Sequence, residues 1–214
     1  KLPLDDAELL AAYRNAFRAH GLGPAGTCLD VLHVNYLKND KLGQKWVVDG
    51  IRLTKELGAR VMLLPFFGNG KLETQTEKDY IGEVLRDIAP QAEKAGVILG
   101  LEDTISAEDN VRIVERTRSK AVMTYYDIGN STANGFSVAR EIEWLGKNRI
   151  CQMHFKDNPH YLGEGPVNLT DILRAVSRIG FAGFANLETD SPSKSVEPDM
   201  KRNLSYVKKA ITEV

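Results

Sequence analysis

The sequence predicts an α/β fold in which parallel strands alternate with helices. Six short apolar runs alternate along the 214 residues with seven segments of helical periodicity. Parallel strands need a crossover connection, and a helix is the usual one. No linker or low-complexity stretch interrupts the series, and 43% of the residues are hydrophobic. The sequence therefore predicts one domain over residues 1–214, built around one core.

The first half of the chain contains three predicted strands. Asp5 or Asp6 can cap a first helix, whose apolar residues are spaced three and four apart and which stops at Gly21. The next two predicted helices also stop at glycines, Gly58 and Gly96, which is a common end signal of helices. They are a strand over 27–34, a helix over 41–57, a strand over 59–66, a helix over 75–95 and a strand over 96–102.

The second half repeats this alternation. Ser106, followed by Asp109, resembles a capping box that opens the next helix. Three further strands are predicted over 121–127, 150–155 and 183–188, with helices near 134–146, 169–179 and 198–212. Periodicity alone does not separate an open doubly wound sheet from a closed barrel.

Ionisable residues stand at the ends of the last four predicted strands. They are Glu102, Asp127, His154 and Glu188. One such residue is more often a solvated group or a helix cap, but four on successive strands point to a site. Parallel strands place their carboxyl ends on one face, so these side chains can converge there. Carboxylate oxygens and one imidazole suit Mn²⁺, Mg²⁺ or Co²⁺, with Zn²⁺ as a further option.

These strand ends resemble the motifs of the xylose-isomerase-like TIM-barrel superfamily of sugar phosphate isomerases and epimerases, to which endonuclease IV is related. The motifs are "LGLED" around Glu102, "YYDIGN" (125–130), "HFKD" (154–157), "GEGPVN" (163–168) and "NLETD" (186–190). Each motif is weak alone, whereas the ordered set is fairly specific. The resemblance implies a (β/α)8 barrel.

The resemblance also implies a reaction. Glu102, Asp127, His154 and Glu188 would bind one divalent metal ion, and the two glutamates would also transfer protons. A metal that chelates the carbonyl and adjacent hydroxyl of a ketose stabilises the enediolate. A carboxylate on each face of that intermediate can remove and return a proton. We therefore expect a metal-dependent isomerase or epimerase of a small sugar or keto-sugar.

Three further residues are candidate substrate contacts. His160 lies six residues after His154, where similar epimerases place a cationic or polar contact; the alternative is an exposed loop histidine. Strand alternation puts Lys156 on the same side as His154. The alternative for Lys156 is a solvated side chain or an ion pair with Asp157. His33, near the end of the first predicted strand, is the weakest candidate.

The chain departs from the family pattern at Asn130, where many relatives have a histidine. Asparagine can still bind a substrate hydroxyl but is a poorer metal ligand. Only four histidines occur in the chain, too few for the three-zinc site of the endonuclease branch. The formal net charge of −1 also argues against nucleic-acid and membrane partners. We therefore expect a small sugar or polyol substrate.

The second departure lies at the front of the chain. A full barrel has eight strands, and only six are predicted. We interpret the first strand, first helix and second strand as absent, and expect the gene product to be longer by about forty to sixty residues. Such a remnant would expose two strand edges. A longer reading frame with an upstream apolar strand would support this interpretation.

Two alternative functions stay open. The same metal chemistry serves a lyase, such as a dehydratase of inosose or dehydroshikimate type, and the chain could also be a non-catalytic sugar-binding barrel. Cys28 and Cys151 have no metal-type spacing, which favours a reducing, cytoplasmic compartment, although the front of the chain leaves an upstream export signal open. Homo-oligomers are common among similar proteins, and the sequence pattern establishes none.

Overall fold

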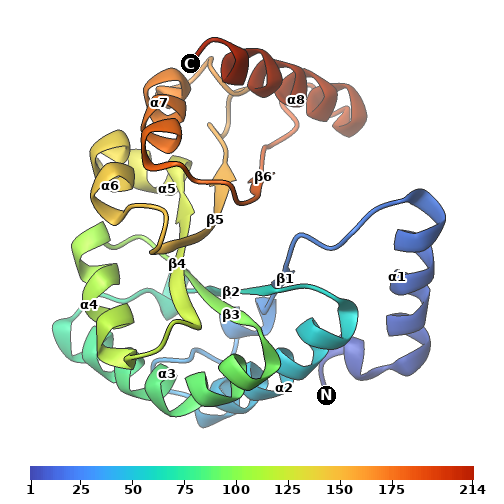
Figure 1. Ribbon diagram of the computed structural model, residues 1–214, viewed down its shortest axis with the longest axis vertical. Helices are drawn as coiled ribbons and strands as arrows, with labels where there is room; N and C mark the ends of the chain where they lie inside the picture. Colours follow the sequence, from blue (N-terminus) through green and yellow to red (C-terminus); the bar gives the residue numbers. More distant parts are fainter. The chain divides into compact units, whose positions relative to one another are not determined.

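The computed structural model in Figure 1 describes residues 1–214, whose six strands are ordered β1 to β6 along the sheet. The chain divides into two units, residues 1–124 and 125–214, with β4 (Val122–Asp127) running across the boundary. The pairings of β1 with β2, β2 with β3, β3 with β4 and β5 with β6 are parallel. The predicted α/β alternation is thus confirmed, whereas the prediction of one domain stays a prediction.

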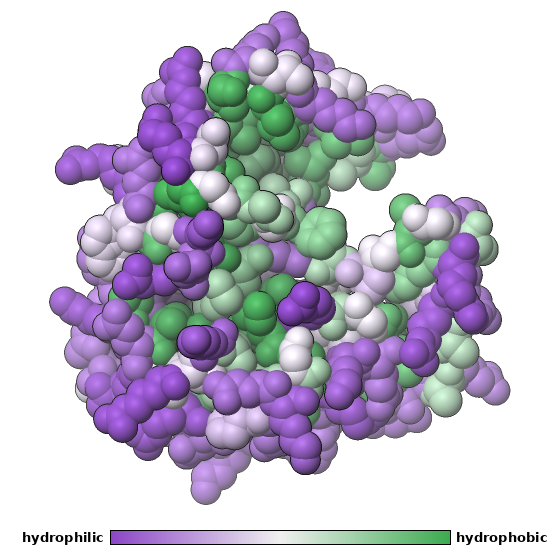
Figure 2. All heavy atoms as spheres, in the orientation of Figure 1, coloured by the Kyte–Doolittle hydropathy of each residue, from purple (hydrophilic) through white to green (hydrophobic).

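The first unit holds β1 to β3 and four α-helices. In chain order it contains η1 (Pro3–Asp5), α1 (Ala7–His20), β1 (Thr27–Cys28), η2 (Asp30–His33), α2 (Lys41–Leu57), β2 (Val61–Pro65), η3 (Gly68–Gly70), α3 (Gln75–Ala95), β3 (Ile98–Glu102) and α4 (Ala107–Thr117). Helix α3 packs against α4, and hydrophilic side chains cover both in Figure 2. Leu64 and Leu99 on β2 and β3, and Ile81 and Leu85 on α3, are fully buried in the core of this unit.

Sequence signals at the helix ends operate as expected. Asp6 accepts hydrogen bonds from two main-chain N–H groups at the start of α1, and Gly21 ends this helix in the left-handed conformation. Thr74 and Glu77 form a capping box at the start of α3. These contacts satisfy the main-chain groups that a helix end leaves without intrahelical partners.

The strand predicted over 27–34 is wrong for most of its length. β1 ends at Cys28, and residues 30–33 form a 3₁₀ turn. Leu29 and Leu32 are buried, a spacing of three that matches one turn of this helix rather than strand alternation. The Leu32 N–H donates to the Leu29 carbonyl over 3.0 Å. His33 therefore lies on an exposed turn and not on a strand.

The second unit begins inside β4. It continues with α5 (Ile128–Ala133), α6 (Val138–Leu145), β5 (Ile150–Phe155), α7 (Leu169–Ile179), β6 (Ala185–Leu187) and α8 (Val196–Thr212). Helices α6 and α7 pack together, and α8 contacts both α7 and β6 (Figure 1). None of the helices in the chain has an apolar stretch of the length that a membrane crossing needs.

Helix α5 is not predicted by the sequence pattern. The Asp127 carboxylate caps this helix by accepting from the Asn130 N–H at 2.8 Å. The predicted helix 134–146 begins only at Val138, because Gly135 has a φ of +79° and separates the two helices. Asp127 therefore both ends a strand and begins a helix.

Candidate metal centre

Two buried strands carry the first candidate ligands, Asp127 as the last residue of β4 and His154 as the next-to-last residue of β5. The Asp127 side chain is 1% exposed and that of His154 is 11% exposed. β5 is buried at Ile150 and from Gln152 to Phe155, so the apolar strand holds its histidine inside the unit. The Nδ1 atom of His154 lies 3.6 Å from Oδ2 of Asp127. Both side chains are thus fixed by strands and by burial.

Glu188 joins them from the residue after β6. Its Oε2 atom lies 3.3 Å from His154 Nδ1, and its side chain is 48% exposed. The ligand atoms that Asp127, His154 and Glu188 offer all lie within 4.8 Å of one another. Three of the four predicted ligands are therefore close enough together to share one ion.

Lys156 lies among these carboxylates. Its Nζ is 2.7 Å from Asp127 Oδ2 and donates a 2.5 Å hydrogen bond to Glu188 Oε2. The ion pair with Asp157 that was one interpretation of Lys156 is wrong, since the Asp157 carboxylate instead accepts from two main-chain N–H groups. The prediction that Lys156 shares a side with His154 is consistent with these contacts.

The charges of this cluster are set by opposing effects. Burial on its own would raise the pKa of Asp127, but the hydrogen bond with His154, the charge of Lys156 and the Asn130 N–H lower it to about 2. Burial likewise opposes the charged form of Lys156, and the carboxylates of Asp127 and Glu188 outweigh it, so that its pKa is raised. At neutral pH, Asp127 is therefore an anion and Lys156 a cation.

A layer of polar side chains lies two residues before the ligands on each strand, on the same face of the sheet. Asn186 donates hydrogen bonds to the Tyr125 hydroxyl and, over 3.4 Å, to the Gln152 side-chain oxygen. The Tyr125 ring lies 4.7 Å from the His154 ring, centroid to centroid. Each residue of this layer precedes a candidate ligand by two positions: Tyr125 before Asp127, Gln152 before His154 and Asn186 before Glu188. Strand alternation applied backwards from the ligands would have found this layer.

The residues present fit a divalent cation. Oδ2 of Asp127 is buried and receives no well-directed hydrogen bond, although Lys156 Nζ pairs with it. A buried carboxylate oxygen of this kind has coordination capacity left for a cation. With His154 and Glu188, the donor set is two carboxylates and one imidazole, which suits Mn²⁺, Co²⁺ or Zn²⁺.

Glu102 belongs to the first unit. It is the last residue of β3, is buried, and pairs in register with Pro65 of β2. The strand-end position predicted for it is thus observed. Its role as a ligand stays a prediction.

The predicted substrate contacts differ in their surroundings. His160 is exposed on the loop after β5, and its N–H donates to the Asp157 carbonyl. Asn130 is half-buried in α5 beside Asp127. His33 is exposed in the first unit, where it contacts Asp30 and stacks on the Phe67 ring. Their roles in substrate binding stay predictions.

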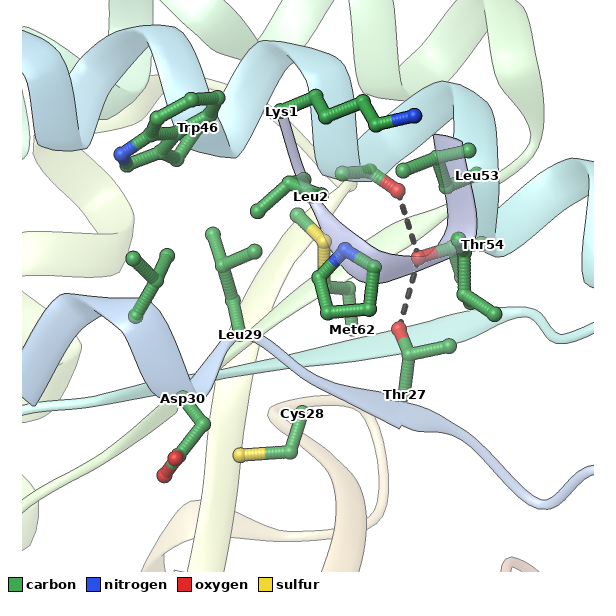
Figure 3. A pocket seen from close by; sticks show the side chains of 14 residues that line it. Lys1, Leu2, Thr27, Cys28, Leu29, Asp30, Trp46, Leu53, Thr54 and Met62 are labelled. Carbon is green, nitrogen blue, oxygen red and sulfur yellow. Dashed lines mark hydrogen bonds between the residues drawn. The ribbon is translucent and has the colours of Figure 1, made fainter. Parts of the chain in front are cut away.

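The first unit also carries an apolar pocket of about 430 Å³ next to β1 (Figure 3). Leu2, Leu29, Trp46 and Met62 are among its lining side chains. Its hydroxyl pair, Thr27 and Thr54, is hydrogen bonded internally over 2.7 Å. Asp30 supplies the one carboxylate among the lining residues, so this pocket lacks a metal-ligand cluster.

Solved structures similar to this chain are sugar epimerases and a metal-binding relative. L-Ribulose 3-epimerase aligns with a TM-score of 0.76 and 18% identity, over 95% of this chain and 80% of the other. The IolI protein with a bound zinc atom aligns with a TM-score of 0.78 and 17% identity, over 95% and 82%. D-Psicose 3-epimerase of Clostridium cellulolyticum H10, solved with D-tagatose, aligns with a TM-score of 0.75 and 15% identity, over 94% and 83%. At these identities the likeness shows the fold.

Sequence comparison agrees with this fold. An uncharacterized protein of Methanocaldococcus jannaschii is 26% identical over 160 residues, a match that covers 63% of this chain and 54% of that protein. The match thus spans about half the length of the curated relative. A family model described as xylose isomerase-like TIM barrel matches residues 1–210, so the chain belongs to that family.

Proposed function

We propose that the protein is a divalent-metal-dependent isomerase or epimerase of a small sugar or keto-sugar. The observation that carries this proposal is the convergence of Asp127, His154 and Glu188, whose ligand atoms lie within 4.8 Å of one another. The similar structures named as L-ribulose 3-epimerase and D-psicose 3-epimerase support a sugar substrate. The bound zinc of the IolI structure supports a metal in this fold.

Glu102 is proposed as the fourth ligand. β3 and β4 are parallel, with Leu101 in register with Thr124. Glu102 is the residue after Leu101, and Asp127 is the third residue after Thr124. Each is the last residue of its strand, so both carboxylates leave the sheet at its carboxyl end. A second glutamate at this end would supply the partner that two-base proton transfer needs.

When bound, the metal would act as a Lewis acid for the substrate carbonyl. The chain's own residues would do the rest. Glu188 is half-exposed at the end of the sheet, so its carboxylate can reach a substrate proton and return it. Lys156 stays cationic and would face negative charge that develops on a substrate oxygen. His160 and Asn130 are proposed to bind hydroxyl groups, and His33 is the weakest such candidate.

A metal-dependent dehydratase uses similar enolate chemistry and is the alternative enzyme. A screen of ketoses and keto-polyols in D₂O with Mn²⁺ separates the two reactions. An isomerase or epimerase incorporates deuterium next to the carbonyl, whereas a dehydratase releases water from an inosose-like substrate.

Glu188→Gln tests the proton-transfer role. We expect it to lower the exchange rate by about 10²- to 10⁴-fold. Glu164→Gln is a matched control, because Glu164 is 49% exposed and pairs with Arg202 at the surface. Equal exchange rates in Glu188→Gln and wild type would overturn the assignment. A wild type that binds no metal and exchanges no proton would leave a non-catalytic barrel.

We also propose that a strand–helix–strand segment completes the sheet. β1 and β6 are its outer strands. β1 lies next to the apolar pocket of Figure 3, and β6 lies next to an apolar groove lined by Phe181, Leu204 and Ile211 among others. Apolar surface along an unpaired strand is typical of a site that another strand covers. An upstream reading frame without an apolar strand would contradict this proposal.

A further inference from the structure

Glu188 is poorly supported by its own strand. β6 has only three residues and ends at Leu187, before the candidate ligand. The Glu188 N–H donates to the Phe155 carbonyl at 3.2 Å, which is the last main-chain bond on this strand. Its side chain is half-exposed, and its polar contacts are with Lys156 and His154 of the same centre, which leave the main chain at residue 188 unrestrained. Something outside the strand has to fix the main chain at this point.

Asn158, on the loop after β5, holds the main chain on both sides of residue 189. Its Oδ1 accepts from the Asp190 N–H at 2.8 Å. Its Nδ2 lies 3.4 Å from the Glu188 carbonyl oxygen, to which it donates a longer hydrogen bond. One amide thus ties the segment 188–190 to the loop that follows His154.

The loop that carries Asn158 is itself anchored. The neighbouring Asp157 is buried, and its two carboxylate oxygens accept from the N–H groups of Gly165 at 2.9 Å and Val167 at 3.1 Å. The chain approaches so closely here that a Cβ on Gly165 would lie 2.3 Å from Asp157 Oδ1. Asn158 therefore projects from a fixed point, which is what a positioning residue requires.

A second asparagine holds the same segment from α8. Asn203 is fully buried, donates to Thr189 Oγ1 at 2.9 Å and accepts from the Leu162 N–H at 3.0 Å. Its loss would leave the buried N–H of Leu162 without a partner. Asn158 is exposed, so its loss leaves no buried polar group without a hydrogen-bond partner. Loss of Asn203 should therefore lower stability, whereas loss of Asn158 should alter only the position of the segment 188–190.

We infer that Asn158 is a positioning residue that orients Glu188 toward the metal centre through the main chain of residues 188–190. This inference rests on the proposed function, because it presupposes that Glu188 is a ligand. Partners that orient metal ligands typically change metal affinity or activity by about 10- to 100-fold when they are removed.

The test is Mn²⁺ binding to Asn158→Ala, measured by calorimetry and by the electron paramagnetic resonance spectrum of the bound ion. We expect affinity about tenfold weaker than wild type and a changed spectrum. The melting temperature without metal should stay unchanged. Asn158→Asp keeps the acceptor for the Asp190 N–H and should recover most of the affinity. Asn15→Ala, on α1, is the matched control and should bind as wild type does.

The outcomes separate this inference from the proposed function. If wild type binds no Mn²⁺, the proposed function fails and takes the inference with it. If wild type binds Mn²⁺ and Asn158→Ala binds it equally well with the same spectrum, the inference alone is overturned. Asn203→Ala provides the contrast: we expect a lower melting temperature in the absence of metal.

Discussion

The ends of β5 and β6 hold their candidate ligands in different ways. β5 has six residues, is largely buried and carries His154 within the strand. β6 has three residues, none of them buried, and Glu188 follows its last residue. His154 is thus placed by burial and strand geometry, whereas the main chain around Glu188 is held by Asn158 on one loop and Asn203 on one helix.

The difference matches the tasks that the proposed function assigns. A ligand that only binds metal benefits from a fixed, buried site. A carboxylate that also transfers a proton has to reach the substrate, and partial exposure allows this. The arrangement teaches that a strand end is not one kind of position: its rigidity depends on the length and burial of the strand behind it.

The largest effect is expected for His154→Ala, which removes the candidate ligand held in the buried strand β5. Removing the imidazole leaves the proposed ligand Glu102 and two carboxylates that Lys156 already pairs, so we expect metal affinity to fall by more than about 100-fold, beyond the effect of losing an outer partner. Metal analysis after dialysis and calorimetry with Mn²⁺ measure this. His20→Ala, on the exposed end of α1, should bind normally. Equal metal content in His154→Ala and wild type would contradict the site assignment.

Lys156→Met tests the ion pairs that link Asp127 on β4 to Glu188 after β6. The single positive charge of Lys156 pairs with both Asp127 and Glu188, so without it these carboxylates lose their ion-pair partner. We expect the metal-free protein to lose about 2 kcal/mol of unfolding free energy, since hydrogen bonds to charged groups are of this size. Thermal unfolding in EDTA measures the loss, and added Mn²⁺ should raise the melting temperature more than in wild type.

Lys201→Met is the control for this substitution, because Lys201 pairs with Glu197 at the surface of α8. Exposed pairs of this kind contribute at most about 1 kcal/mol. Identical melting curves of Lys156→Met and wild type in EDTA would show that Lys156 does not stabilise the carboxylates.

Asp199→Asn tests the anchoring of the loop after Glu188, because Asp199 on α8 accepts hydrogen bonds from Ser191 and Ser193 of that loop. Burial would raise the pKa of Asp199, but hydrogen bonds from Ser191, Ser193 and Tyr161 lower it to about 2. Because the folded pKa is below the ordinary value of 3.8, the carboxylate stabilises the fold above that value, and this contribution is lost as the pH falls through about 2. We expect a modestly lower melting temperature at pH 7 and a shrinking difference from wild type towards pH 2.

Asp87→Asn on α3 is the matched control, because its carboxylate is 79% exposed. Its melting temperature should follow that of wild type at each pH. A difference between Asp199→Asn and wild type that stays constant down to pH 2 would mean that the charge of Asp199 is not the stabilising feature.

Elements with a long, regular pattern of apolar residues could be predicted from the sequence, and short elements could not. β5 over 150–155 and α7 over 169–179 have the predicted bounds, because apolar periodicity and end signals agree there. The strand over 27–34 failed, because Leu29 and Leu32 are spaced for a 3₁₀ turn. Helix α5 is not predictable in this way, because six residues are too few for a periodic pattern and its cap, Asp127, also ends a strand.

By itself, the sequence determined the α/β alternation, the family motifs and the positions of Asp127, His154 and Glu188 at strand ends, because these depend on local periodicity and chain order. Only the tertiary structure decided that Lys156 pairs with Asp127 and Glu188 rather than with its neighbour Asp157. It likewise decided that Asn158 holds the segment 188–190. These contacts join residues about thirty positions apart, and which groups meet at that distance depends on how neighbouring loops pack, which no local pattern encodes.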